Sequence, residues 1–506
     1  MTFNFLRSLT GRPACWAAFG LGALSALALP PLHIIPVLFI AIPGLIVLLE
    51  NAAPKSAFRR GFCFAFGHHL LGLYWITEAI LFEAERFWWL VPLAVPALAL
   101  VLANFIAVPC WLAARVKPGL GRVLALCGLW TLAFLAQQFV ATGFPWNPLG
   151  SVWAIPGPVG DLALQPVSVI GAPGLSLLTL LLAATPVMGK RAMASGFAMF
   201  ALVIGWSADR LTHSASPAPG LSVVLVQGNI IQGQKGNRAA ATGIFERHLS
   251  LTETGVEQAQ GGSSGGGQRT VVVWPETASP YLVDRDPNAR AAVAEAAAGP
   301  AFIGAIRFDE HDQPRNSLIG VYGPGPALGH YDKFHLVPFG EYIPDWLPIP
   351  VKILPGIGLA GGDGPRTLRL PGVPPAGALI CYEAAFPGAV VDEADRPEWM
   401  VNVTNDSWFG NSSGPRQHLA AVRMRAVEEG LPIMRAANSG ITAGFDAHGH
   451  ELGRLGMGET GVLLIGLPGF LPPTPFARFG LWIPLACALL VTLAGLWIAR
   501  RQAAAH

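Results

Sequence analysis

Long apolar runs dominate the N-terminal part of the chain and return near its C-terminus. A helix that spans a bilayer needs about 20 mainly apolar residues. Eight runs approach that length, near residues 13–30, 33–50, 61–82, 88–113, 122–140, 164–187, 192–208 and 476–499. The pattern predicts an N-terminal transmembrane bundle of about seven helices over residues 1–211. It also predicts a C-terminal transmembrane helix with a cytoplasmic tail over residues 474–506.

Basic residues fall on alternate sides of these runs, and this asymmetry predicts the orientation. With a cytoplasmic N-terminus, the cytoplasmic side holds Arg7, Arg12, Lys55, Arg59, Arg60, Arg115, Lys117, Arg122, Lys190, Arg191, Arg500 and Arg501. The opposite short loops hold only Arg86. Cytoplasmic loops are enriched in lysine and arginine, so residues 220–468 are expected outside the cytoplasm. The first apolar run also fits a cleaved signal peptide, but the bundle that follows directly favours a retained helix.

Residues 220–468 have a different pattern, in which short β-branched runs end in polar clusters. Such runs are typical of buried strands. They lie at 223–226, 271–273, 302–306, 318–322, 378–380 and 400–403, and residues 417–429 have the periodicity of a helix. Strands that alternate with helices predict a layered α/β domain. The Gly/Ser/Gln-rich stretch 256–268 is expected to be a flexible insertion.

The composition agrees with a membrane protein. Charged residues make up 13% of the 506 residues and hydrophobic residues 52%, whereas soluble domains carry about 25% charged residues. The formal net charge of +2 and the lack of a basic patch argue against a nucleic-acid partner.

Six cysteines are present, and Cys381 alone lies outside the apolar runs. Their spacing indicates neither a zinc site nor a disulfide framework. A free thiol in an oxidising compartment persists poorly unless function retains it. As a nucleophile it needs a nearby base or cation, and in their absence Cys381 is simply a buried, inert cysteine.

Two polar residues in similar positions offer such a base and cation. Glu276 follows the run 271–273, and burial is expected to raise its pKa and make it a better base. Lys333 can stabilise an oxyanion and lower the thiol pKa. Taken singly, a solvated carboxylate and a surface lysine are the simpler interpretations.

The contexts of the three residues together resemble the nitrilase (carbon–nitrogen hydrolase) superfamily. The matching stretches are WPE at Glu276, YDKFHLVPFGEYIP at Lys333 and ICYE at Cys381, followed by VNVTNDSWFG and RAANSG. The resemblance covers roughly residues 220–468. It implies an α/β nitrilase-like four-layer α-β-β-α sandwich with a Glu–Lys–Cys triad, and no metal or organic cofactor.

The whole layout, about eight spans around such a domain, is similar to that of the apolipoprotein N-acyltransferase family. Its members take an acyl chain from a phospholipid. They attach it to the N-terminal amine of the diacylglyceryl-cysteine of an apolipoprotein, through a cysteine thioester. The resemblance therefore implies a phospholipid donor, a diacylated apolipoprotein acceptor and a multi-pass, monomeric protein of the bacterial inner membrane with a periplasmic catalytic domain.

The resemblance also implies roles for particular residues. Glu276 is the base, Lys333 the oxyanion partner and Cys381 the nucleophile, with Glu341, Tyr382 and Glu383 in supporting positions. The family usually has a tryptophan shortly after the Gln-Gly-Asn strand, and here Gly236 stands in its place.

An apolar stretch within residues 339–366 invites a separate hypothesis. So many apolar side chains are unusual in a soluble loop, so this stretch is either a mobile lid that admits acyl chains or a loop packed on the protein. Its candidate residues are Trp346 and Leu347, and Trp408 and Phe409 are candidates for the same apolar mouth.

Two other functions compete with acyl transfer. A membrane-tethered amidase would use the same triad with water as the second nucleophile, but it needs neither the apolar loop nor the spans. A transporter or receptor with an inactive sensor domain would not need all three triad residues, and transporters favour repeated, broken spans.

Overall fold

The computed structural model describes residues 2–81, 84–235, 237–261, 269–344 and 358–504. The chain divides into two compact units. The first contains Met1–His213, Ser412–Ala420 and Pro475–His506, and the second contains Ser214–Asn411 and Ala421–Thr474.

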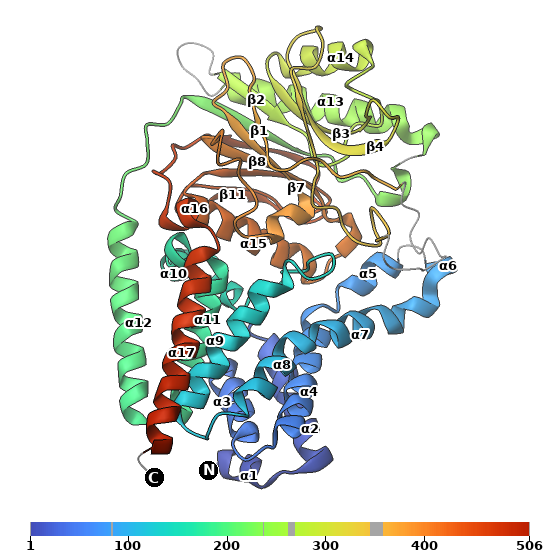
Figure 1. The fold of residues 1–506 in the computed structure, drawn as a ribbon. Coiled ribbons are helices and arrows are strands. Elements are labelled where there is room, and N and C mark those ends of the chain that lie inside the picture. Colours follow the sequence, from blue (N-terminus) through green and yellow to red (C-terminus); the bar gives the residue numbers. More distant parts are fainter. Residues whose placement is uncertain (1, 82–83, 236, 262–268, 345–357, 505–506) are drawn as a thin grey trace. The chain divides into compact units, whose positions relative to one another are not determined.

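The first unit is helical (Figure 1). Its longer helices are α2 (Gly11–Ala26), α3 (Leu38–Leu49), α4 (Pro54–Gly72), α7 (Val91–Leu102), α8 (Asn104–Ala113), α9 (Leu120–Gln137), α11 (Val167–Met188), α12 (Lys190–Arg210) and α17 (Trp482–Ala504). Shorter ones are α1 (Thr2–Ser8), α5 (Ile76–Leu81), α6 (Ala84–Phe87), α10 (Pro158–Leu164) and α16 (Pro475–Phe479).

Within the described residues, five helical stretches are long and apolar enough to cross a bilayer. They are Trp88–Ala113, Leu120–Gln137, Val167–Met188, Lys190–Arg210 and Trp482–Gln502. The predicted transmembrane bundle is confirmed, whereas the number of eight spans stays a prediction. The other three windows hold the 16-residue α2, the stretch Ile35–Leu49, and α4, which carries three basic residues near its start.

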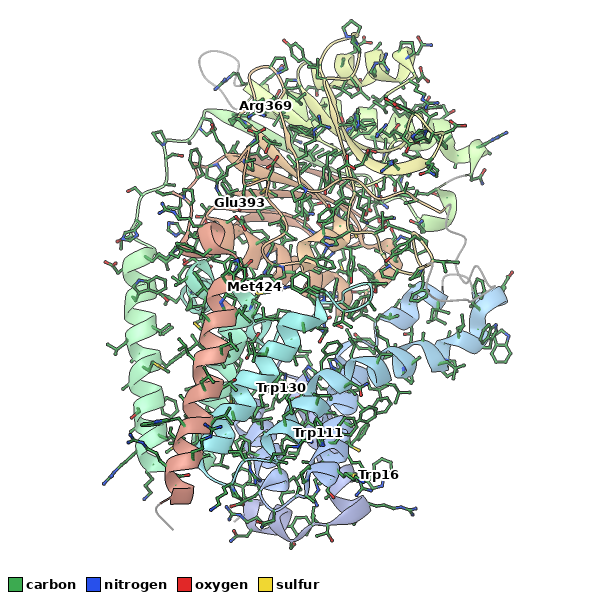
Figure 2. All side chains as sticks on the ribbon, viewed as in Figure 1. Trp16, Trp111, Trp130, Arg369, Glu393 and Met424 are labelled. Atoms are coloured by element: carbon green, nitrogen blue, oxygen red, sulfur yellow. The ribbon has the colours of Figure 1, made fainter. Side chains whose placement is uncertain are left out.

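Glycines let these helices approach closely. A Cβ at Gly22 of α2 would lie 1.8 Å from the Phe64 carbonyl oxygen of α4, and one at Gly121 of α9 would lie 2.5 Å from the Gly495 carbonyl oxygen of α17. Small residues at such crossings are typical of membrane helices. Large apolar side chains remain on the outside, such as Trp16 at 72% exposure (Figure 2). A lipid-facing surface accounts for them.

The second unit contains two six-stranded sheets. The first has the order β12-β1-β2-β3-β4-β5 and the second β11-β10-β9-β8-β7-β6. Their bounds are β1 (Leu221–Gln227), β2 (Arg269–Val273), β3 (Ala301–Phe308), β4 (Pro314–Val321), β5 (His330–Asp332), β6 (Thr367–Leu368), β7 (Ala376–Ile380), β8 (Trp399–Asn405), β9 (Ile433–Asn438), β10 (Thr442–Phe445), β11 (Glu451–Leu455) and β12 (Gly461–Gly466). Strands β1–β2–β3 and β7–β8–β9 are parallel, and the remaining pairs are antiparallel.

Alternate residues of the strands serve two different cores. Val223 and Leu225 of β1 belong to a core that both sheets share, while Val224 and Val226 face a core formed with helices. Those helices are α13 (Arg238–Gly261) and α14 (Pro287–Ala297). Helix α15 (Gly414–Glu429), whose last residues belong to this unit, lies along the second sheet (Figure 1). The predicted four-layer α-β-β-α sandwich is confirmed.

The predicted strands all fall within β1, β2, β3, β4, β7 and β8, apart from residue 322, which lies one residue beyond β4. The expected flexible insertion at 256–268 is partly wrong. Helix α13 continues to Gly261, because the side chains of its own residues Val256 and Ala259 are buried.

Candidate active site

Lys333 lies between two carboxylates in the second unit. It follows β5, and its Nζ is 3.2 Å from Oε1 of Glu276, which comes shortly after β2. The same Nζ is 2.9 Å from Oε1 of Glu341. Lys333 is 1% exposed and Glu276 5%. Solvent therefore screens this ion cluster very little.

Asn316 of β4 completes the cluster, and we refer to Glu276, Asn316, Lys333 and Glu341 as the catalytic cluster. The Asn316 Nδ2 donates to Oε1 of Glu276 at 2.6 Å and to Oε1 of Glu341 at 3.2 Å. The second oxygen of Glu341 accepts from the Val337 N–H at 2.7 Å. The structure thus brings Glu341 to the predicted pair. Asn316 was not among the predicted site residues, since it lies two residues before the predicted run 318–322 and its burial is visible only in the structure.

Cys381 stands where β7 ends and the 3-10 turn η5 (Cys381–Ala385) begins. Its φ of +50° is in the left-handed region, which is uncommon for residues other than glycine. Its side chain is buried, and burial raises the pKa of the thiol to about 12, with Glu276 adding to the rise and Lys333 opposing it. Lys333 lowers the thiol pKa as expected, but burial and Glu276 raise it by more, so the resting thiol is less acidic than a free one.

The pKa of Glu276 also differs from the expectation. Burial raises it, but the nearby Lys333 charge and the hydrogen bonds from Asn316 and Lys333 lower it further, so the pKa lies below its ordinary value. At neutral pH the site therefore holds a thiol beside an ionised carboxylate. Moving the thiol proton to Glu276 leaves the net charge of the cluster and thiol together unchanged. The transfer runs against the pKa difference between the two groups, so it depends on stabilisation of the developing charge by Lys333.

Glu383 connects the two sheets. Its Oε1 accepts from the Tyr331 hydroxyl at 2.6 Å and from the Phe334 N–H at 2.8 Å, both beside Lys333. Its Oε2 accepts from the Ile380 N–H at 2.6 Å, next to Cys381. Burial raises the pKa of Glu383 to about 7 although these hydrogen bonds lower it. Glu383 thus fixes the segment of the lysine relative to the segment of the nucleophile.

Tyr382 directly follows Cys381 in the chain and is buried. Its ring meets Phe386 edge-on at a centroid distance of 5.1 Å, and the His335 ring stacks on the same phenylalanine at 3.8 Å. These aromatic contacts fix the turn that follows the nucleophile.

A second buried network, which sequence analysis missed, lies on the sheet of Cys381. We call Asn402, Thr404, Asp406 and Arg435 the arginine network. Arg435 of β9 donates to Oδ1 of Asn402 and to Oδ2 of Asp406, both at 2.7 Å. Thr404 donates to Oδ1 of Asp406 at 3.2 Å, and its hydroxyl also lowers the pKa of the Cys381 thiol by hydrogen bonding.

The remaining candidates are placed only in part. Trp408 and Phe409 lie in the 3-10 turn η6 (Asp406–Phe409) and are half-buried. Trp346, Leu347 and Gly236 lie outside the described residues. Over the described part of the chain, no group of three or more His, Cys, Asp or Glu residues is placed to hold a metal ion.

Two family models match the chain. One, described as Apolipoprotein N-acyltransferase N-terminal domain, covers residues 21–185. The other, described as Carbon-nitrogen hydrolase, covers residues 225–467 and contains all the residues of the site.

Full-length relatives match as well. The chain is 38% identical to an apolipoprotein N-acyltransferase of Bradyrhizobium diazoefficiens over 96% of this chain and 94% of the relative. It is 36% identical to one of Rhodopseudomonas palustris and 37% identical to one of Sinorhizobium medicae, with similar coverage. Among solved structures, yeast Nit3 of the nitrilase superfamily is 16% identical over 50% of this chain and 91% of Nit3, with a TM-score of 0.35.

Proposed function

Because the chain belongs to the apolipoprotein N-acyltransferase family, it is an acyltransferase, and we propose that Cys381 carries the acyl group as a thioester between donor and acceptor. The donor is a phospholipid, and the acceptor is the N-terminal amine of a diacylated apolipoprotein. This is the last step of lipoprotein maturation.

The observation that carries this proposal is the catalytic cluster beside a buried thiol. Glu276 is ionised and able to accept a proton, and Cys381 is protonated and able to give one. Lys333 supplies the positive charge that a developing oxyanion needs. Amide hydrolysis is the less supported alternative, because it accounts for the match over residues 225–467 but not for the one over residues 21–185.

In the first step, Cys381 Sγ attacks the ester carbonyl carbon of the phospholipid while its proton passes to Glu276. Lys333, together with the Tyr382 backbone N–H, stabilises the tetrahedral oxyanion. The C–O bond then breaks, and the lysophospholipid oxygen takes the proton from Glu276. A thioester on Cys381 remains.

In the second step, the apolipoprotein amine attacks the thioester carbonyl carbon. Glu276 accepts the amine proton, and Lys333 again stabilises the oxyanion. The C–S bond breaks, an amide forms, and the proton on Glu276 returns to the sulfur. Glu341 takes no proton in either step and holds Lys333 in place through its 2.9 Å ion pair.

Mass spectrometry of the purified full-length protein tests this scheme. After incubation with phospholipid alone, the wild type is expected to carry one acyl group that hydroxylamine releases from Cys381. A Cys381→Ala variant is expected to carry none. A wild type that turns over lipid without an acyl mass on Cys381, or an equally labelled Cys381→Ala variant, would overturn it.

The membrane arrangement forms part of the same proposal. The chain is a bacterial membrane protein. We place residues 1–211 and 474–506 in the inner membrane and residues 220–468 in the periplasm, on the basis of the basic residues in alternate loops. We further propose that the protein is a monomer. Trp408 and Phe409 are proposed to line the acyl-chain mouth together with Trp346 and Leu347.

A further inference from the structure

A second lysine, Lys235, contacts the backbone of Glu276. It follows the 3-10 turn η4 (Gln232–Gln234), which comes shortly after β1. Its Nζ donates to the Glu276 carbonyl oxygen at 3.2 Å and to Oγ1 of Thr277 at 3.3 Å. Lys235 is half-buried. Neither of the two proposed acyl-transfer steps uses this lysine.

The backbone that Lys235 contacts needs such support. Thr277 has a φ of +47°, and a β-branched residue rarely adopts this left-handed conformation. Gly304 of β3 lies against the same turn and accepts from the Ala278 N–H at 2.8 Å. A Cβ at Gly304 would lie 2.9 Å from the Cα of Glu276. The strained turn is therefore held by Gly304 through the backbone and by Lys235 through its ammonium group.

The charge of Lys235 also acts on the Glu276 carboxylate. Among the described residues, no carboxylate lies within ion-pair distance of the Lys235 Nζ, so no direct partner neutralises it. Its effect lowers the pKa of Glu276, in addition to the effects of the other groups around that carboxylate. Those groups are Lys333 and Glu341 across the cluster, Asn316 on β4 and the Cys381 thiol.

We propose that Lys235 is a positioning residue for Glu276. Its ammonium group holds the Glu276–Thr277 turn through two hydrogen bonds, so that the carboxylate stays in position to take the thiol proton. This inference rests on the proposed function, because it assumes that Glu276 is the base.

The test measures the rate of acyl-adduct formation on Cys381 between pH 3.5 and 9.5, in full-length protein with phospholipid as donor. In Lys235→Met, the acid limb of the profile is expected to move up by about one pH unit, because a cation near a carboxylate lowers its pKa by one to three units. The maximal rate is expected to fall about tenfold, as is typical when a supporting partner is lost, with the KM for phospholipid unchanged.

Two further variants separate charge from bulk. Lys235→Arg is expected to keep the wild-type acid limb. Gln234→Met, an exposed neighbour without charge, is the matched control and is expected to behave as the wild type. Burial lowers the pKa of Lys235 to about 8, so the wild type loses this cation above that pH. The difference between wild type and Lys235→Met should then narrow at pH 9.5, where Lys235→Arg still carries its charge.

An unshifted acid limb in Lys235→Met overturns the inference. So does a loss seen with phospholipid but not with the neutral donor p-nitrophenyl palmitate, since Lys235 would then bind the head group. If Lys235→Met does not purify as folded protein, Lys235→Gln is measured against the same expectations. A wild type that forms no Cys381 adduct at any pH would instead overturn the proposed function.

Discussion

The catalytic cluster and the arginine network are both buried in the second unit, one on each sheet, and they differ in charge balance. The catalytic cluster has two carboxylates around one ammonium group, Lys333. The arginine network pairs one guanidinium, Arg435, with one carboxylate, Asp406, both fully buried. A balanced pair with all its hydrogen bonds made has little reason to change its protonation. An excess carboxylate next to a thiol can accept a proton. The two networks are both buried, so the difference between a catalytic and a structural role lies in their charge balance.

The largest expected effect comes from Lys333→Met. Acyl transfer should fall about 100- to 1,000-fold, the usual loss when an oxyanion partner is removed. Without the ammonium group, Glu276 and Glu341 face each other as like charges, so one of them takes up a proton and the base is weakened. Acyl-adduct formation on Cys381 measures the loss. The double change Lys333→Met with Glu341→Gln should recover thermal stability without recovering activity, and recovered activity would contradict the role of Lys333.

Arg435→Met should act on stability instead. It leaves Asp406 buried without its partner, and breaking a buried pair costs about 3–5 kcal/mol. Denaturant unfolding of the purified protein in detergent measures this loss. Adding Asp406→Asn should restore part of the stability, because the unpaired charge is then gone. Acyl transfer by the folded fraction should stay within about tenfold of wild type, since the Asp406 charge acts on the Cys381 thiol less strongly than burial, Glu276 or Lys333. A loss as large as that of Lys333→Met would make the arginine network catalytic.

The smallest effect concerns Glu383, which links the two sheets. Burial raises its pKa to about 7 from an ordinary value of 4.5. The folded state thus binds a proton that the unfolded state has already released. This group therefore stabilises the fold more as pH falls from above 7 towards 4.5. Comparing thermal unfolding at pH 8 and pH 5 should show this trend in wild type and its loss in Glu383→Gln. The same change in thermal stability with pH in both proteins would contradict the raised pKa of Glu383 as its cause.

Sequence alone was enough for the fold class and for the three residues proposed as the triad. Glu276 and Cys381 follow apolar runs that are predicted as strands, and the ends of strands are where the sites of α/β domains are usually assembled. That the two strands, β2 and β7, belong to different sheets could not be predicted from the runs themselves. Asn316 and Arg435 were missed because their partners depend on strand register. Asn316 reaches Glu341 only because Ser317 of β4 pairs with Asp332 of β5.

Each single effect expected from the sequence acts in the expected direction, but the net pKa shifts of Glu276 and Cys381 are the opposite, for a related reason. Burial alone predicts a raised pKa for Glu276, and an adjacent lysine alone predicts a lowered pKa for Cys381. The sign of each shift depends on distances between charges, such as the 3.2 Å between Lys333 and Glu276. Those distances come from loops that connect separate strands, and no local pattern encodes them.

The pairing of β1 with β12 has a consequence for how the protein is made. β1 opens the second unit and β12 is its last strand, yet they pair along six residues from Ser222 to Gln227. During synthesis, the outer edge of β1 stays unpaired until residues 461–466 have been made, and an open strand edge is prone to wrong pairing. The sheet that bears Glu276 and Lys333 can close only just before α17 enters the membrane. A chain that stalls before residue 461 therefore lacks the last strand of the first sheet and leaves an unfinished domain with an open strand edge.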